Sequence, residues 1–170
     1  VRWIRSRSFP IHDAAGTVYR LAGICEDITE AKLQDLSIRR LSRIHRVLSG
    51  TNSAIVRIHE RDELLDEACR IAVEEGGFPI AWVAMQQADN AGARCVASRG
   101  IDADTLAQLD VYLGNRRNEQ WDAARGALES RRPVMISNLS KHLEDAGPVS
   151  HKAVELGYGT VISLPLMPNG

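Results

Sequence analysis

The feature that most constrains the fold is a long segment, residues 29–58, whose apolar residues recur with helical spacing and which contains no proline. Thr29 can cap a helix, and Glu30 is favourable in its first turn. From Leu41 onward the apolar positions alternate three and four residues apart if Thr51 fills one of them. This spacing is typical of a coiled coil and extends over about two and a half heptads. The segment therefore predicts one long helix that connects the parts of the chain on either side.

Gly50 is the weak point of this predicted helix, because glycine in a helix interior costs about 1 kcal/mol relative to alanine. The polar stretch 49–52 is therefore either a hinge or a polar patch on the exposed side. Leu33 and Leu36 do not share the register of the later apolar residues, which predicts a register change within the helix. We expect Gly50→Ala to alter coupling through the helix more than it alters folding.

Residues 1–28 contain two strand patterns joined by a turn at residues 13–16. An isolated hairpin is marginally stable in water, so we expect the body of this domain to lie upstream. At the other end, residues 160–166 form a strand pattern followed by Asn169-Gly170, a strong hairpin signal. The chain is thus expected to be a piece of a longer protein; the alternative is a complete small domain with a frayed start.

Between these ends the periodicity alternates between helices and strands. Helices are predicted at 62–75, from 102, at 119–130 and at 149–156, and strands at 80–85, 94–98 and 134–137. Strand pairs with helices between them predict an α+β domain with a mainly antiparallel sheet. No dinucleotide fingerprint or phosphate-binding loop accompanies this order.

Composition excludes several classes of function. The chain has 170 residues, of which 44% are hydrophobic and 25% charged, with a formal net charge of −1. This balance excludes a strongly basic nucleic-acid binder, and no apolar run is long enough to predict a membrane span. The chain has three cysteines: Cys25, Cys69 and Cys95. Their odd number disfavours a disulfide framework or a zinc site and favours a protein of the reducing cytosol.

The sequence contains no recognisable catalytic arrangement. It lacks the G-x-S-x-G, H-E-x-x-H and phosphate-loop motifs, and its five histidines show no helical ligand spacing. The arginines at 39, 40, 43 and 46 are not interleaved with aromatic residues, so we interpret them as a solvated helix face rather than a nucleic-acid site. His45 is interpreted as a surface residue. We predict no enzyme activity and no metal site for this segment.

Four large side chains on predicted strands and a predicted helix are candidates for lining a ligand pocket: Trp82, Met85, Trp121 and Met135. Core packing is the alternative for each of them.

The start of the chain resembles the C-terminal part of a PAS sensor domain. The pattern Trp3-Ile4-Arg5 is followed by Pro10, Asp13 and Gly16, and then by the run from Gly23 to Lys32, which contains Asp-Ile-Thr. This run matches the family's last strand and its junction with the following helix. The resemblance implies a sensor whose signal passes into that helix through Asp27, Ile28 and Thr29.

The remainder of the chain resembles a GAF domain without its closing strand and C-terminal helix. The matching stretches occur in the family's order, at residues 47–55, 64–72, 77–83, 132–139 and 158–166. A bilin-attaching cysteine and the cyclic-nucleotide N-K-x-D-E motif have no match, so the ligand class and any cofactor stay open.

Together these resemblances imply an α+β fold in which a PAS-type C-terminal hairpin (1–29) and a linker helix (30–45) precede a GAF-like antiparallel sheet flanked by helices (46–170). They imply a sensory module of a cytoplasmic bacterial signalling protein, whose parent could be anchored in a membrane upstream. The downstream output would be cyclic-di-GMP turnover or a histidine kinase. We expect a homodimer through the linker helix, relay residues that include Gly50, and a possible small-molecule ligand in the GAF-like part. The alternative is a dimerisation scaffold with no ligand of its own.

Overall fold

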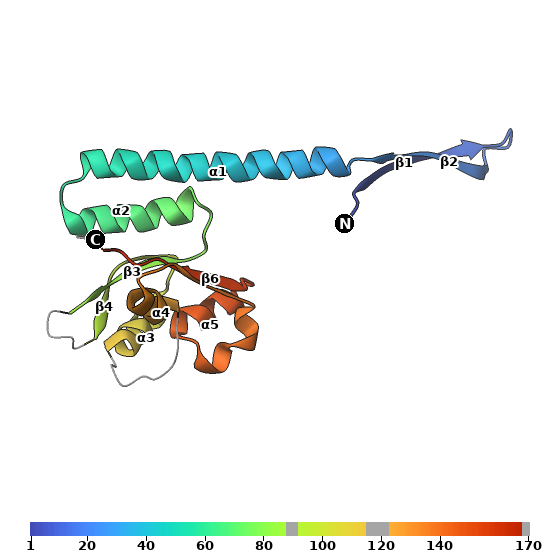
Figure 1. The fold of residues 1–170 in the computed structure, drawn as a ribbon. Coiled ribbons are helices and arrows are strands. Elements are labelled where there is room, and N and C mark those ends of the chain that lie inside the picture. Colours follow the sequence, from blue (N-terminus) through green and yellow to red (C-terminus); the bar gives the residue numbers. More distant parts are fainter. Residues whose placement is uncertain (88–91, 115–122, 168–170) are drawn as a thin grey trace. The chain divides into compact units, whose positions relative to one another are not determined.

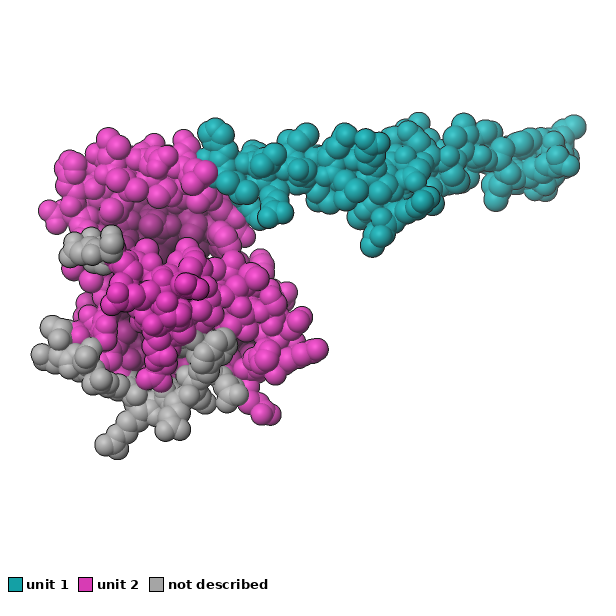
Figure 2. Space-filling model, in the orientation of Figure 1, with its two compact units in different colours: residues 1–46 teal, residues 47–170 magenta. Residues whose placement is uncertain are grey.

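The structure is a computed structural model that describes residues 1–87, 92–114 and 123–167. It contains two compact units, Val1–Arg46 and Val47–Gly170, which Figure 2 shows in different colours. The boundary between the units falls inside one helix, so each unit is described separately below. The predicted Asn169-Gly170 turn lies outside the described residues.

The first unit contains the predicted hairpin. Strands β1 (Ile4–His12) and β2 (Val18–Asp27) pair antiparallel, with Ile4 opposite Asp27 (Figure 1). The turn forms because Oδ1 of Asp13 accepts hydrogen bonds from the backbone N–H groups of Ala15 and Thr17, both at 2.9 Å. Nearly every side chain of the two strands is exposed, which is why the hairpin has no apolar core of its own.

Helix α1 (Thr29–Arg57) runs without interruption through Gly50, which confirms the predicted long helix. Four residues of the predicted seam form a stripe of exposed apolar side chains, each between 45% and 63% exposed: Leu41, Ile44, Leu48 and Ile55. We call these four residues the α1 stripe. Ile58, the last position of the predicted seam, is instead buried at the end of the helix.

The second unit begins with a helix pair. A neighbouring face of α1 packs on α2 (Arg61–Glu74), where Ala54, Ile58 and Ile71 are 2%, 7% and 1% exposed. Val47 and Leu64 pack against this cluster. The C-terminal half of α1 therefore presents two apolar faces, one buried against α2 and one exposed.

The rest of the second unit mixes short strands and helices. Strand β3 (Ala81–Gln86) pairs antiparallel with β4 (Ala93–Arg99), and β5 (Val134–Ser137) pairs antiparallel with β6 (Thr160–Ser163). The helices are α3 (Ala103–Gly114), α4 (Ala123–Ser130) and α5 (Pro148–Glu155), with short 3₁₀ turns at Leu139–Lys141 and Leu143–Asp145. Residues 119–122 of the predicted fourth helix lie outside the described part.

The α+β class is confirmed, whereas the expected single antiparallel sheet is seen only as pairs. Among the described residues the strands form three two-stranded sheets, one in the first unit and two in the second. Alternation of apolar residues identifies a strand but does not say which strands share hydrogen bonds. In the second unit the most deeply buried large side chains are Ile71 and Leu139.

Candidate functional site

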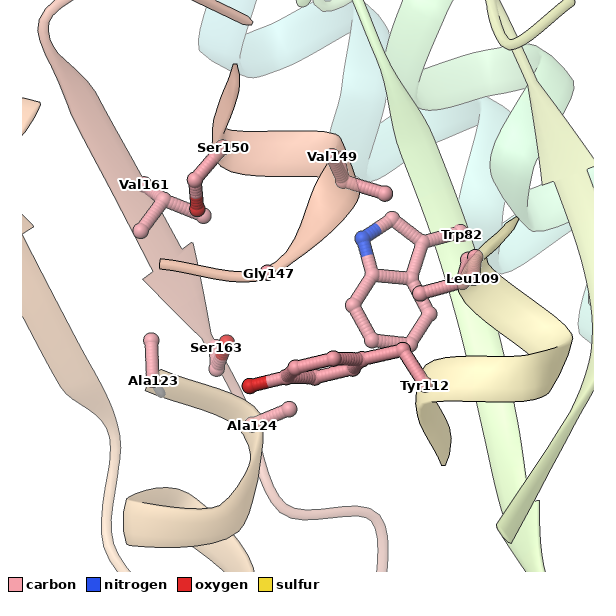
Figure 3. A pocket seen from close by; sticks show the side chains of 10 residues that line it. All are labelled: Trp82, Leu109, Tyr112, Ala123, Ala124, Gly147, Val149, Ser150, Val161 and Ser163. Atoms are coloured by element: carbon pink, nitrogen blue, oxygen red, sulfur yellow. The ribbon is translucent and has the colours of Figure 1, made fainter. Parts of the chain in front are cut away.

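The second unit contains a pocket between α3, α4, α5 and the two strands β3 and β6 (Figure 3). Its free volume is about 30 Å³, enough for one or two water molecules. Ten described residues line it: Trp82, Leu109, Tyr112, Ala123, Ala124, Gly147, Val149, Ser150, Val161 and Ser163. The pocket thus draws its walls from five elements that are distant in the sequence.

The lining is apolar with a few polar groups. Trp82 and Tyr112 contribute aromatic rings, and Ser150 and Ser163 contribute hydroxyl groups (Figure 3). None of the described lining residues carries a charge. Walls of this kind, largely hydrophobic with a few polar groups, are typical of small-molecule sites.

Gly147 fits closely against Tyr112. A Cβ atom at position 147 would lie 3.1 Å from Cε1 and 3.2 Å from Cζ of the Tyr112 ring. Gly147, the N-cap residue immediately before α5, has ordinary backbone angles (φ −70°, ψ 168°), so its backbone does not require glycine. The absence of a side chain there leaves room for the aromatic ring.

An ion pair ties together α3 and α5, which supply four of the ten lining residues. Nζ of Lys152 on α5 lies 2.8 Å from Oδ2 of Asp102, and Oδ1 of Asp102 accepts a 2.8 Å hydrogen bond from the backbone N–H of Thr105 at the start of α3. The hydrogen bond from Lys152, followed by those from Thr105, lowers the pKa of the Asp102 carboxyl. The same contact raises the pKa of Lys152. Asp102 therefore both caps α3 and holds α5 against it.

Of the four pocket residues predicted from the sequence, the structure places Trp82 in the pocket. Met85 and Met135 do not line it; they are 36% and 64% exposed. Trp82 and Met85 are three residues apart on β3, and side chains at odd spacing point to opposite faces of a strand. Met135 lies on the exposed face of β5. Trp121 lies outside the described residues.

Sequence reasoning missed most of the lining. Tyr112 follows Leu109 by three residues on α3, so the two share a helix face, and this spacing was a usable signal. No sequence pattern identifies Ser150 and Ser163 as pocket residues, because isolated serines are usually surface residues.

The strand-to-helix junction of the first unit contains the predicted relay residues. The backbone N–H of Thr29 donates to Oδ1 of Asp27 at 2.9 Å, and Oγ1 of Thr29 accepts from the backbone N–H of Trp3 at 2.8 Å. The backbone N–H of Ile28 donates to the carbonyl of Trp3 at 2.9 Å. Hydrogen bonds from Thr29 lower the pKa of Asp27. The structure thus brings Asp27, Ile28 and Thr29 together where β2 becomes α1.

Gly50, the fourth relay residue, lies where α1 faces α2. A Cβ atom there would be 3.0 Å from Oε2 of Glu75 and 3.4 Å from two carbons of Ile71. Gly50 therefore lies at a close contact between the two helices, with a carboxylate nearby. From the sequence alone, a hinge and an exposed polar patch were the two alternatives for this part of the helix.

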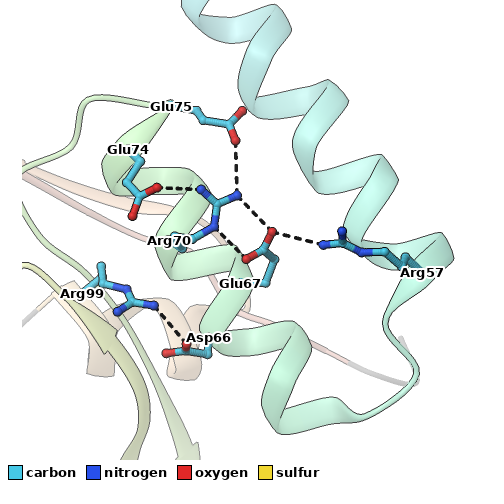
Figure 4. Close-up of polar contacts among 7 residues, drawn as sticks. All are labelled: Arg57, Asp66, Glu67, Arg70, Glu74, Glu75 and Arg99. Atoms are coloured by element: carbon cyan, nitrogen blue, oxygen red, sulfur yellow. Dashed lines mark hydrogen bonds and ion pairs between the residues drawn. The ribbon is translucent and has the colours of Figure 1, made fainter.

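A network of charged side chains on and next to α2 reaches the end of α1 (Figure 4). Arg70 contacts Glu67 and Glu74 at 2.7 Å and Glu75 at 3.4 Å, and Arg57 of α1 contacts Glu67 at 3.5 Å. Hydrogen bonding by Arg70 is the main cause of the lowered pKa of Glu67. Each of these two arginines and three glutamates is paired with an opposite charge, so we assign the network a structural role.

The thiols of Cys69 and Cys95 are poorly suited to nucleophilic chemistry. Burial raises the pKa of the Cys69 thiol to about 11 and also raises that of Cys95, so both stay protonated and poorly nucleophilic at neutral pH. No group of three or more histidine, cysteine or acidic side chains in the described ranges is arranged to hold a metal ion. None of the helices in those ranges has the length and apolar composition needed to cross a bilayer.

Comparison with known proteins gives no match: no protein-family model, no curated protein and no solved structure is significantly similar to this chain.

Proposed function

We propose that this chain is a non-catalytic sensory module of a bacterial signal-transduction protein. It relays the binding of a ligand or partner through α1 to a downstream output domain, either one that turns over cyclic-di-GMP or a histidine kinase. The observation that carries the proposal is α1 itself, since one unbroken helix begins at the hydrogen-bonded junction of the hairpin and extends into the second unit.

The mechanism is a population shift between two packings of the module. A ligand that binds one packing more tightly than the other favours it, and a rotation or register change of α1 carries that bias along the chain. Gly50 is suited to such a change because it lies at the packed interface of α1 and α2 and contributes no side chain to it.

Pairing of two copies along the α1 stripe is the second part of the proposal. Leu41, Ile44, Leu48 and Ile55 repeat at coiled-coil spacing and are exposed in the single chain. Exposed apolar stripes of this kind mark interaction surfaces. A second copy would cover both stripes at once, and the two α1 helices could then rotate against each other.

Sedimentation velocity tests this pairing with a matched pair of variants. We expect the wild type to sediment as a dimer, Leu48→Glu as a monomer and Ser49→Glu as a dimer, because residue 49 lies about 100° around the helix from residue 48. A monomeric wild type, or a Leu48→Glu protein that dimerises as the wild type does, would rule out the pairing.

A dimerisation scaffold that binds no ligand is the second candidate. The small free volume of the pocket, about 30 Å³, is the observation that favours it. This candidate shares the pairing of α1 with the first and differs from it only at the pocket.

A further inference from the structure

We infer that pairing along the α1 stripe is weakened by acid, because it sets His45 of one copy against Arg40 of the other. The inference rests on the proposed pairing and names how that same surface is regulated. It is carried by the positions of the two residues beside the stripe and by their exposure in the single chain. Within the described residues, neither of them forms an ion pair with an acidic side chain.

Arg40 and His45 flank the α1 stripe on its two sides. The spacing of the stripe makes Leu41 and Leu48 the a positions of a heptad and Ile44 a d position. Arg40 then occupies a g position, and His45 occupies the following e position. In a parallel pair in register, the g residue of one helix faces the e residue five positions later in its partner. Arg40 of each copy therefore faces His45 of the other, and this contact occurs twice.

Parallel pairing is favoured by the hairpin, whose apolar side chains are exposed and need cover. The middle of the stripe lies near Leu48, about 28 Å along the helix from Thr29, where the hairpin ends. An antiparallel pair would hold the two hairpins roughly 56 Å apart, whereas a parallel pair brings them to the same end. The exposed side chains of one hairpin can then cover those of the other.

In the single chain, His45 has no charged neighbour on its own face of α1. The side chain is exposed, so no other described element covers it. The α1 residues one turn away from it are uncharged: Leu41, Ser42, Leu48 and Ser49. Asp35, the acidic residue nearest to it in the sequence, pairs instead with Arg39 at 3.0 Å. Arg40 of the second copy is therefore the charged group that His45 meets on pairing.

The direction of the effect follows from these charges. Arginine stays protonated, whereas a histidine side chain gains a positive charge as the pH falls from about 8 to about 5. A neutral His45 does not repel Arg40, but a protonated one does, so acid adds two like-charge contacts to the pair. Exposed contacts of this kind are individually weak, so we expect the dissociation constant to rise about three- to five-fold.

Sedimentation equilibrium at about pH 8 and about pH 5.5, at low ionic strength, measures the dissociation constant of the pair. His45→Gln should remove the rise seen on acidification of the wild type. Arg40→Glu should reverse it, because a protonated His45 then meets a carboxylate. Arg43→Glu is the matched control, since it makes the same charge change about 160° around the helix from Leu41 and should keep the wild-type response. All three positions are exposed, so these variants should fold.

The inference is overturned if the wild-type dissociation constant is the same at both pH values, if His45→Gln keeps the rise, or if Arg40→Glu responds to acid as the wild type does. An antiparallel pair would give the last result, because Arg40 of one helix would then lie far from His45 of the other. A wild type that is monomeric at both pH values would refute the proposed pairing itself, whereas a dimer insensitive to pH would refute this inference alone.

Discussion

At Gly50, both helix propensity and the packing of α1 on α2 determine how a substitution changes stability. Replacing it with alanine removes the cost of glycine in a helix interior, and the new methyl group displaces only the end of the flexible Glu75 side chain, 3.0 Å away. We therefore predict that Gly50→Ala raises the free energy of unfolding by up to about 1 kcal/mol, measured by urea denaturation. A loss of more than about 1 kcal/mol would show that the two helices cannot accept a methyl group there.

Asp102 is the residue that makes the link between α3 and α5 sensitive to pH. Its pKa in the folded chain lies below the ordinary value of 3.8. Its stabilising effect is therefore fully present above that value and is lost as the pH falls through the folded pKa. We predict that Asp102→Asn reduces the loss of stability of the wild type on acidification from about pH 5, measured by urea denaturation at several pH values.

Lys152→Met is the matched test of the same ion pair from the other side. It removes the first cause of the lowered pKa, so it should also reduce the acid dependence, although the backbone N–H of Thr105 still hydrogen bonds to Asp102. Acid dependence equal to that of the wild type in both variants would refute the role of this pair.

At the residue scale, the sequence predicted the strand-to-helix junction better than the pocket. Asp27, Ile28 and Thr29 are consecutive, so local hydrogen bonding brings them together whatever the tertiary fold. The pocket joins residues of five elements, and its composition depends on which strand face and helix face turn inward. Trp82 lines the pocket and Met85 does not. The apolar pattern indicates a strand but does not fix which of its faces turns inward.

At the element scale, the apolar cluster between α1 and α2 should contribute more than the ion pairs around it. Ile71 is 1% exposed, whereas the side chain of Arg57 is 72% exposed. We predict that Ile71→Ala lowers the free energy of unfolding by about 3 kcal/mol and Arg57→Ala by less than about 1 kcal/mol. Thermal and urea unfolding of the two variants provide the comparison, and similar losses in both would contradict this ranking.

Elements with strong local signals were predicted closely. The 29-residue helix α1 and the strand β5 have the expected positions, because a proline-free segment with helical spacing and a β-branched stretch after Pro133 are local features. The register in which the strands pair was not predicted. The register shifts at a bulge in β4, since Val83 pairs with Ala97 and Ala84 with Cys95. Beside the bulge, the Asp110 carboxylate, which is distant in the sequence, accepts a hydrogen bond from the Cys95 backbone N–H at 3.1 Å.

At the scale of the whole molecule, the two units differ in how well they bury their apolar residues. The second unit has its own core, whereas the first leaves large side chains of the hairpin and α1 exposed, with Leu21 at 75% and Ile24 at 70%. A hairpin of this kind needs cover to be stable. The predicted division into a hairpin, a linker helix and a larger domain stays a prediction, as does the sensory role.

The central claim is that two copies pair along the α1 stripe, and disulfide trapping tests it most directly. In a Cys25→Ser background, which removes the exposed native thiol, one variant carries Leu48→Cys and its control carries Ser49→Cys. The account predicts rapid oxidation of the Leu48→Cys chain to a covalent dimer and slow oxidation of the control. Equal rates in the two variants, or no covalent dimer in either, would contradict it.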